Sequence, residues 1–476
     1  MRRVRIAAVC SAALAAAGLL AQEPPPTQAQ QRPTFRGGAR FVRVDVFPTG
    51  KDGKPIEGLT AADFEVFEDG KPQAIDTFDF VRVEPELEGM RIDPNTQKEG
   101  EEMARDPRAR LFVFVLDTRH VDLEASRRMR RPLADMVDRL LGPRDMFGII
   151  TPQLRPSDLI LGRKSATADD MMTRYWTWGV SDNIVPQDSV EQLVESCFGS
   201  ITSINGAITR ELIARHREKQ TLDHLAGLVE KVGGLRDERK AIIVVSQGWR
   251  LFARDENMLR TNGAAAPPIT GSGGRVRIGA DPMTGMIAGS DCYEQARSLW
   301  NVDSPAFFRE LLRKAQRANV AFYPIDPRGL APFDTPISHG AVRAPTIELS
   351  RLAERADGLR TLAENTDGIA LLMNNDLGSQ LRKLADSLST YYLLGYYSTN
   401  TKFDGGYRRL EVKVRRSDVR VRARRGYLAP TQEEIDGIAA RREVASRPPS
   451  AEALMLGGAL GRLNEVRHDR DLFVQA

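Results

Sequence analysis

The sequence has little of what metal centres and nucleotide sites are usually built from. Its 476 residues include five histidines and three cysteines. No His-Glu-x-x-His pattern and no zinc-type cysteine spacing occurs among them. The Gly-rich stretch at 270–274, "TGSGG", lacks the Gly-Lys-Ser/Thr ending of a phosphate loop. We therefore expect no cofactor.

The chain also lacks a strong charge of one sign and a long apolar run. Lysine and arginine total 68 against 64 aspartates and glutamates, and a net charge of +4 gives no ground for nucleic-acid binding. The apolar stretch 6–21 is short for a bilayer span, which needs about 20 residues. It follows three arginines and ends in a small residue, Ala21, as signal peptides do. We predict a cleaved signal peptide at 1–21 and a secreted or periplasmic protein that is not transmembrane after cleavage; an uncleaved anchor is the alternative.

Cysteines are scarce enough for their pairing to be considered directly. Cleavage after residue 21 would remove Cys10 and leave Cys197 and Cys292. In an exported chain two cysteines are typical of a disulfide. Two unpaired thiols are the alternative.

The first part of the chain reads as a leader and a small β unit. Residues 22–38 are rich in Pro and Gln and are predicted to be a flexible leader. In 39–83, the N-terminal β segment, valines alternate with polar residues from Val42 to Val46. Asp69-Gly70 suits the tip of a type I′ hairpin. The acidic stretch 84–108 is predicted to be a linker.

The central part, 109–389, alternates short apolar runs with helical patterns, which predicts an α/β domain with a parallel-dominated sheet covered on both faces. A long loop without periodicity occupies 254–290. A C-terminal β segment at 390–428 and a helical tail at 429–476 follow. Because neither β segment is large enough to be stable alone, we expect them to pair into one antiparallel β module. The predicted strands of the central domain are 111–117, 146–151, 241–248, 320–326 and 369–375.

Several stretches together carry a resemblance to a known family. They are the opening "VDVFPTGKDGKPIEGLTAADFEVFEDGKPQAI", the strand "LFVFVLDT", "KAIIVVSQG" and the closing "YYLLGYYSTNTKFDGGYRRLEVKVRRSDVRVRARRGYLAP". Over about residues 40–430 the chain resembles the secreted VWFA-related (von Willebrand factor type A-like) proteins described from acidobacteria. The resemblance implies a Rossmann-like VWA core, an adhesion or scaffold role and no catalytic activity.

The resemblance also implies a place for a metal ion, because many A domains bind Mg²⁺ or Ca²⁺ through an Asp-x-Ser-x-Ser run, a later Thr and a later Asp. Asp117 matches the first ligand and Thr202 the loop Thr, whereas Arg119, Val121 and Gln247 replace the other three. A guanidinium beside a cation is strongly repelled. We therefore predict a degenerate site without tightly bound metal, in which Arg119 pairs with Asp117.

One enzymatic alternative deserves a place beside the noncatalytic interpretation. Ser246 follows an apolar strand and precedes Gln-Gly, and Asp326 and His339 follow in the order found in serine hydrolases. However, Val244 stands where the strained elbow of those enzymes needs a glycine. A serine at a strand end is the favoured interpretation. A purely structural envelope component is a third possibility.

Two sets of residues are candidates for contact with a partner, an unknown protein or an anionic surface polymer. The first lies at the carboxyl edge of the sheet, where α/β proteins bind ligands. The second is a row of basic side chains on two neighbouring predicted strands, for which a solvated face that prevents edge aggregation is the alternative. The first set is Asp117, Arg119, His120, Thr202, Gln247, Asp326 and Arg328; the second is Arg409, Lys413, Arg415, Arg420, Arg422 and Arg424.

Overall fold

A computed structural model describes residues 40–51, 54–82, 94–106, 109–163, 178–179, 186–201, 206–236, 238–257, 289–331 and 345–437. The predictions for 1–21 and 22–38, and for most of 254–290 and 429–476, lie outside these residues.

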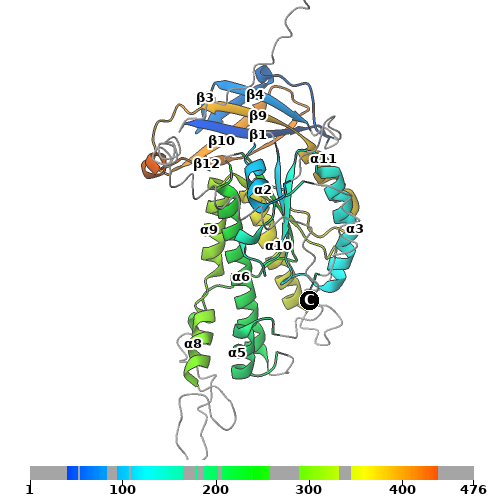
Figure 1. Ribbon diagram of the computed structural model, residues 1–476, viewed down its shortest axis with the longest axis vertical. Helices are drawn as coiled ribbons and strands as arrows, with labels where there is room; N and C mark the ends of the chain where they lie inside the picture. Colours follow the sequence, from blue (N-terminus) through cyan, green and yellow to red (C-terminus); the bar gives the residue numbers. More distant parts are fainter. Residues whose placement is uncertain are drawn as a thin grey trace, which may run out of the picture. The chain divides into compact units, whose positions relative to one another are not determined.

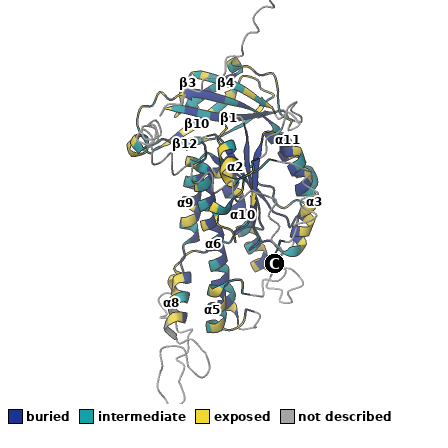
Figure 2. Cartoon of the chain, in the orientation of Figure 1, coloured by how far each residue is buried: buried dark blue, intermediate teal, exposed yellow. Residues whose placement is uncertain are grey.

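The centre of the fold is a parallel sheet with the strand order β6-β5-β7-β8. Every residue of β5, β7 and β8 is buried, as the dark strands of Figure 2 show. Unbroken apolar runs predict this arrangement, because strands covered on both faces have no solvent side to carry polar residues. The strands are β5 (Leu111–Leu116), β6 (Met146–Ile150), β7 (Lys240–Val245) and β8 (Val320–Ile325).

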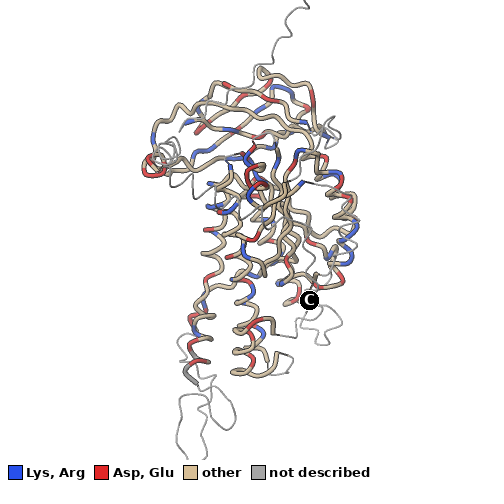
Figure 3. Tube along the Cα trace, viewed as in Figure 1, with Lys and Arg blue, Asp and Glu red and all other residues tan. Residues whose placement is uncertain are grey.

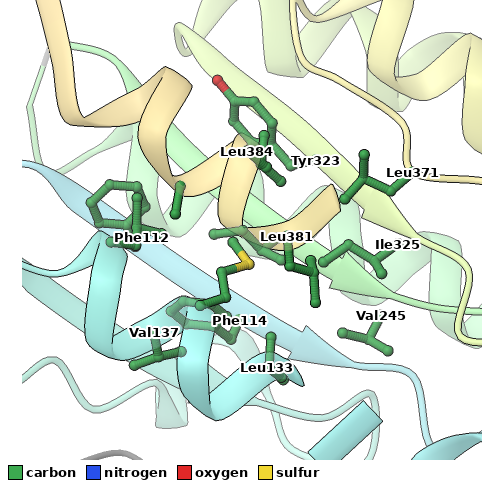
Figure 4. Packing of buried hydrophobic residues seen from close by; sticks show 14 of the residues in the cluster. Phe112, Phe114, Leu133, Val137, Val245, Tyr323, Ile325, Leu371, Leu381 and Leu384 are labelled. Carbon is green, nitrogen blue, oxygen red and sulfur yellow. The ribbon is translucent and has the colours of Figure 1, made fainter. Parts of the chain in front are cut away.

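Helices cover both faces of this sheet (Figure 1). On one face, α3 (Leu123–Leu140) and α11 (Leu377–Ser389) pack side by side and bury leucines against alternate side chains of the strands (Figure 4). On the other face lie α6 (Ala207–Gly233), α9 (Ser304–Arg317) and α10 (Pro345–Asn365). The predicted α/β class with a Rossmann-like core is confirmed.

The two β segments at the ends of the described chain form one module of two four-stranded antiparallel sheets. β1 pairs with β9, and β2 pairs with β10, so each sheet joins strands from both segments. A shared apolar core lies between the sheets. The expected pairing is confirmed. The first sheet contains β1 (Phe41–Thr49), β4 (Ile75–Arg82), β9 (Thr390–Tyr397) and β11 (Arg420–Ala423), and the second contains β2 (Phe64–Glu68), β3 (Lys71–Gln73), β10 (Tyr407–Val414) and β12 (Gly426–Leu428).

The hairpin between β2 and β3 turns where the sequence predicts. Asp69 and Gly70 both have positive φ angles, 50° and 79°, as the two central positions of a type I′ turn require. The turn places Glu68 opposite Lys71 and so sets the register of the hairpin.

Three sequence predictions differ from the structure. The predicted strand 369–375 contributes only an isolated parallel bridge between Leu371 and Ile325, because the backbone becomes left-handed at Met373, with φ 51°. The predicted linker 84–108 contains a helix, α2 (Gln97–Ala104), whose Ala104 joins the core. The predicted basic strand 419–428 divides into β11 and β12, which lie in different sheets.

The remaining described elements are α5 (Ser189–Phe198), α8 (Gly289–Trp300) and the short 3-10 helices η1 (Ala61–Asp63) and η2 (Pro156–Asp158). Both signs of charge are interspersed along the described helices, in keeping with the small net charge (Figure 3). A search of the described residues finds no helix with the length and apolarity needed to cross a bilayer.

Candidate functional site

The carboxyl ends of three parallel strands bring Asp117, Ser246 and Asp326 to one edge of the sheet. The ladder continues one residue past each strand. The Asp117 N–H donates to the Val245 carbonyl at 3.0 Å, and the Ser246 N–H donates to the Ile325 carbonyl at 3.1 Å. The backbone hydrogen bonds therefore fix the positions from which these three neighbouring polar side chains extend.

Asp117 is fully buried, and both of its carboxylate oxygens accept hydrogen bonds. Oδ2 accepts from the Ser246 hydroxyl at 2.7 Å and from the Trp249 indole N–H at 3.1 Å. The His120 ring nitrogen Nδ1 lies 2.9 Å from Oδ2 and 3.0 Å from Oδ1. An ionised carboxylate only accepts, so Nδ1 carries the proton. Burial raises the pKa of Asp117, but the nearby His120 charge and the bonds from His120, Ser246 and Trp249 outweigh it, and the pKa is lowered.

The predicted pairing of Arg119 with Asp117 is wrong. Of the groups of Arg119, the backbone N–H is the one that donates to the Asp117 carboxylate, at 3.2 Å from Oδ1. The guanidinium lies instead near Gln187, 3.5 Å from its Oε1, and its buried Nε has no hydrogen-bond partner. The reason is the tight turn after β5, in which the His120 N–H donates to the Asp117 carbonyl and brings the imidazole back over the carboxylate.

The other positions of the family's metal site do not fit a cation. Val121 is fully buried in the apolar core beneath α3. The Gln247 side-chain amide donates to Asp122 at 2.6 Å. Thr202 lies outside the described residues. Asp117 spends both oxygens on donors of the protein, and across the described part of the chain no group of three or more His, Cys, Asp or Glu side chains is placed to hold a metal ion.

Ser246 does not have the surroundings of an activated nucleophile. It is fully buried, its hydroxyl donates to Asp117, and it accepts the Gly248 N–H at 3.0 Å. The proton that a general base would remove is thus held by a carboxylate in a closed network. His339, the third residue of the hydrolase order, lies outside the described residues.

Asp326 and Arg328, which follow β8, form a buried ion pair that is hydrogen-bonded to the loop after β7. The Arg328 Nη2 donates to Asp326 Oδ2 at 2.8 Å and to the Gln247 carbonyl at 2.8 Å. The Arg328 side chain is 6% exposed and the Asp326 side chain is 2% exposed. The pair therefore ties the loop after β8 to the loop after β7.

Glu218, which the sequence analysis missed, fixes the chain that leaves this edge. Its side chain is 1% exposed and accepts three consecutive backbone N–H groups, from Arg250, Leu251 and Phe252, at 2.9 to 3.0 Å. Leu251 has a positive φ of 52°, which turns the three N–H groups toward one point. In the sequence Glu218 lies within the charged run "RHREK", a composition typical of a solvent-exposed helix face, so nothing in the sequence marks it as buried.

We predict that Glu218→Gln lowers the free energy of unfolding by about 2 kcal/mol. The amide keeps one acceptor oxygen but turns its NH₂ group toward buried N–H donors. Urea unfolding of both proteins measures the difference. Glu230→Gln on the same helix is the matched control, because its pair with Lys314 is at the surface and worth about 0–1 kcal/mol. Equal losses in the two variants would contradict the role of Glu218.

The disulfide predicted between Cys197 and Cys292 is confirmed, with 5.6 Å between the two Cα atoms. It joins α5 to α8. A small apolar cluster that includes Val194, Leu212 and Trp300 packs beside it. The bridge closes the part of the chain that contains the predicted loop 254–290.

The six basic residues of the second candidate set do not form one surface. Arg409 and Lys413 are exposed on β10, in one sheet of the β module, and Arg415 is exposed directly after that strand. β11 belongs to the other sheet, and there only Arg420 is exposed. Arg422 and Arg424 are partly covered, and their guanidiniums lie over the rings of Phe47 and Tyr427. The predicted single anionic-polymer face is therefore corrected to two separate groups.

No protein-family model matches the chain, and no curated protein matches it either.

Proposed function

We propose that the chain is an exported, noncatalytic binding protein of the VWFA-related type, which holds a protein partner at the carboxyl edge of its parallel sheet without a metal ion. The observation that carries the proposal is the state of Asp117. A metal-dependent adhesion site needs this carboxylate free to coordinate, whereas here Ser246, Trp249 and His120 use its oxygens. The same bonds occupy the Ser246 hydroxyl, which favours binding over hydrolysis.

Exposed apolar side chains beside this network are the expected contact points. Leu330 and Met373 are 59% and 47% exposed, and they lie on the loops that follow β8 and the Leu371 bridge. The two loops contact each other, since the Leu330 N–H donates to the Asn375 side chain at 2.8 Å. Large apolar groups held at the surface by a rigid polar framework are typical of protein interfaces.

Export is supported by two features of the chain. Disulfides persist in oxidising compartments, and Cys197 is bridged to Cys292. Residues 1–21 have the basic start and apolar core of a signal peptide. We place the protein in the periplasm or outside the cell.

A pull-down from the exported protein fraction tests the proposal. We expect the double variant Leu330→Asp, Met373→Asp to retain about ten times less partner than the wild type, because the new charges would be buried in the interface. Ile160→Asp is the matched control. Ile160 is also an exposed apolar residue, at 69%, but it lies beside the edge strand β6 and not on the two loops. Retention should be unchanged by a chelator. Binding that needs Mg²⁺ or Ca²⁺, or that survives the double variant at full strength, would contradict the proposal.

A further inference from the structure

A cavity of about 40 Å³ lies between the β module and the amino edge of the parallel sheet. At about 10–15 Å³ for each water, it has room for about three water molecules or one small oxyanion. Its wall combines apolar side chains with an unusual number of charged ones. The charged residues are Asp45 from β1, Arg110 before β5, and Arg236, Glu238 and Arg239 before β7.

Two of these charged groups are already paired. Arg110 forms a buried ion pair with Asp145 and also donates to the carbonyls of Leu140 and Leu388. Glu238 pairs with Arg43, which lies two positions before Asp45 in β1. Asp45, Arg236 and Arg239 are the charged lining residues that neither pair uses.

The Nη atoms of Arg236 already donate to backbone carbonyls, and Arg239 Nη2 donates to the Tyr323 hydroxyl and the Asp367 carbonyl. Each of the three residues nevertheless keeps an unused hydrogen-bonding group. The Nε atoms of Arg236 and Arg239 are buried without a partner. Asp45 is 5% exposed and accepts no hydrogen bond from the described residues. Burial raises the pKa of Asp45, with Arg239 and Arg424 opposing that rise. Buried polar groups almost always have a partner, in the protein, in water or in a ligand.

Positive charge is in excess around the same interface. Arg422 approaches it from β11 and Arg424 from the position after that strand, and the Nη atoms of Arg422 and the Nε of Arg424 are also buried without a partner. The field of Asp45 acts on Arg424, and that of Asp367 acts on both arginines. Beside the pairs Glu238–Arg43 and Arg110–Asp145, four arginines thus face two carboxylates among the described residues. The interface is electrostatically suited to an anion.

A ligand that satisfies this cavity must accept from guanidinium N–H groups and also donate to a carboxylate. Hydrogen phosphate does both, since it has three acceptor oxygens and one P–O–H donor. Sulfate has no proton to donate at neutral pH and would leave Asp45 facing an anionic oxygen. We propose that the cavity binds inorganic hydrogen phosphate, held by Arg236 and Arg239 and recognised through its hydroxyl by Asp45.

Phosphate bound there would connect the two parts of the described chain. Asp45 belongs to the β module, whereas Arg236 and Arg239 lead into β7 of the parallel sheet. The site would therefore stabilise their contact, independently of any partner at the opposite, carboxyl edge.

Calorimetry on the full chain at pH 8 and constant ionic strength tests the proposal, with phosphate, sulfate and chloride as the probes. We expect phosphate to bind about ten- to a hundredfold more tightly than sulfate, the ratio that one unsatisfied buried acceptor produces. Asp45→Asn, which supplies an N–H donor in the same shape, should bring the two affinities within about threefold of each other. Arg239→Gln should weaken phosphate by about tenfold or more. Arg420→Gln, an exposed arginine of β11, should change neither affinity.

Three results would overturn the proposal. The wild-type protein could release no heat with millimolar phosphate beyond that with chloride, which would mean that water alone fills the cavity. It could bind sulfate as tightly as phosphate. Asp45→Asn, folded by circular dichroism, could keep the full preference for phosphate. The first two need no variant, so a variant that fails to fold leaves the proposal testable.

Discussion

Asp117→Ala is expected to lower the free energy of unfolding by about 3–5 kcal/mol, the cost of breaking a buried charged pair by removing one partner. The substitution leaves the Ser246 hydroxyl, the Trp249 indole N–H and the His120 ring without their acceptor, at a position that water does not reach. Because these donors come from two separate segments of the chain, the turn after β5 and the loop after β7, the loss loosens the contact between them. Urea unfolding followed by tryptophan fluorescence measures it.

Asp122→Asn is the matched control for this prediction. Asp122 lies in the same loop, caps α3 by accepting the Ala125 N–H at 2.7 Å, and receives the Gln247 amide. Asparagine is a comparable N-cap, so the control should lose no more than about 1 kcal/mol. A loss below about 1 kcal/mol in Asp117→Ala, or a rise in wild-type stability on adding Mg²⁺, would show that the carboxylate is free for a metal.

The contribution of Asp117 also has a predictable pH dependence. Its pKa in the folded protein is lowered below the unfolded value of about 3.9. Stability gained from the carboxylate is therefore fully present above about pH 4 and is lost as the pH falls through the lower folded pKa. The difference between wild type and Asp117→Asn should shrink as the pH falls below about 4.

Much of the fold can be predicted from short local patterns of apolar and polar residues. Unbroken apolar runs identify β5, β7 and β8, because only strands covered on both faces dispense with polar residues. The β module was predictable from a different argument: two segments too small to fold alone must find each other. The predicted strand 369–375 failed because apolar content does not reveal the left-handed turn at Met373.

The candidate site was harder to predict, because its key contacts join residues far apart in sequence. The Asp117 position is visible as the end of an apolar strand, but Trp249, which bonds to it, lies 132 positions away. Whether Arg119 or His120 pairs with Asp117 depends on the turn after β5. This turn directs the His120 side chain back toward the carboxylate and the Arg119 side chain away from it. Charge alone favoured Arg119. The backbone geometry decided for His120.

Removing the disulfide by Cys197→Ser and Cys292→Ser is expected to cost about 3–4 kcal/mol. The bridge spans 95 positions, for which the chain-entropy model gives about 4.7 kcal/mol. The loss should be smaller than that figure, because disulfides typically contribute about 2–4 kcal/mol. In the folded protein α5 is also held to α6 by the buried pair of Glu191 with Arg217, at 2.7 Å.

We also expect the loss of stability to affect α8 before it affects the rest of the fold. α5 keeps its ion pair in the variant, and Asp188, whose pKa is lowered to about 2 despite partial burial, keeps the Glu191 N–H and His216 as partners. Among the described contacts, α8 keeps the apolar cluster around Trp300 and the hydrogen bond from the Asp255 N–H to the Trp300 carbonyl. Hydrogen exchange in the double variant should therefore accelerate in α8 more than in α5, whereas urea midpoints report the total. Equal midpoints for oxidised and reduced wild-type protein would mean that the apolar cluster alone holds α8, and that the bridge contributes nothing to folding stability.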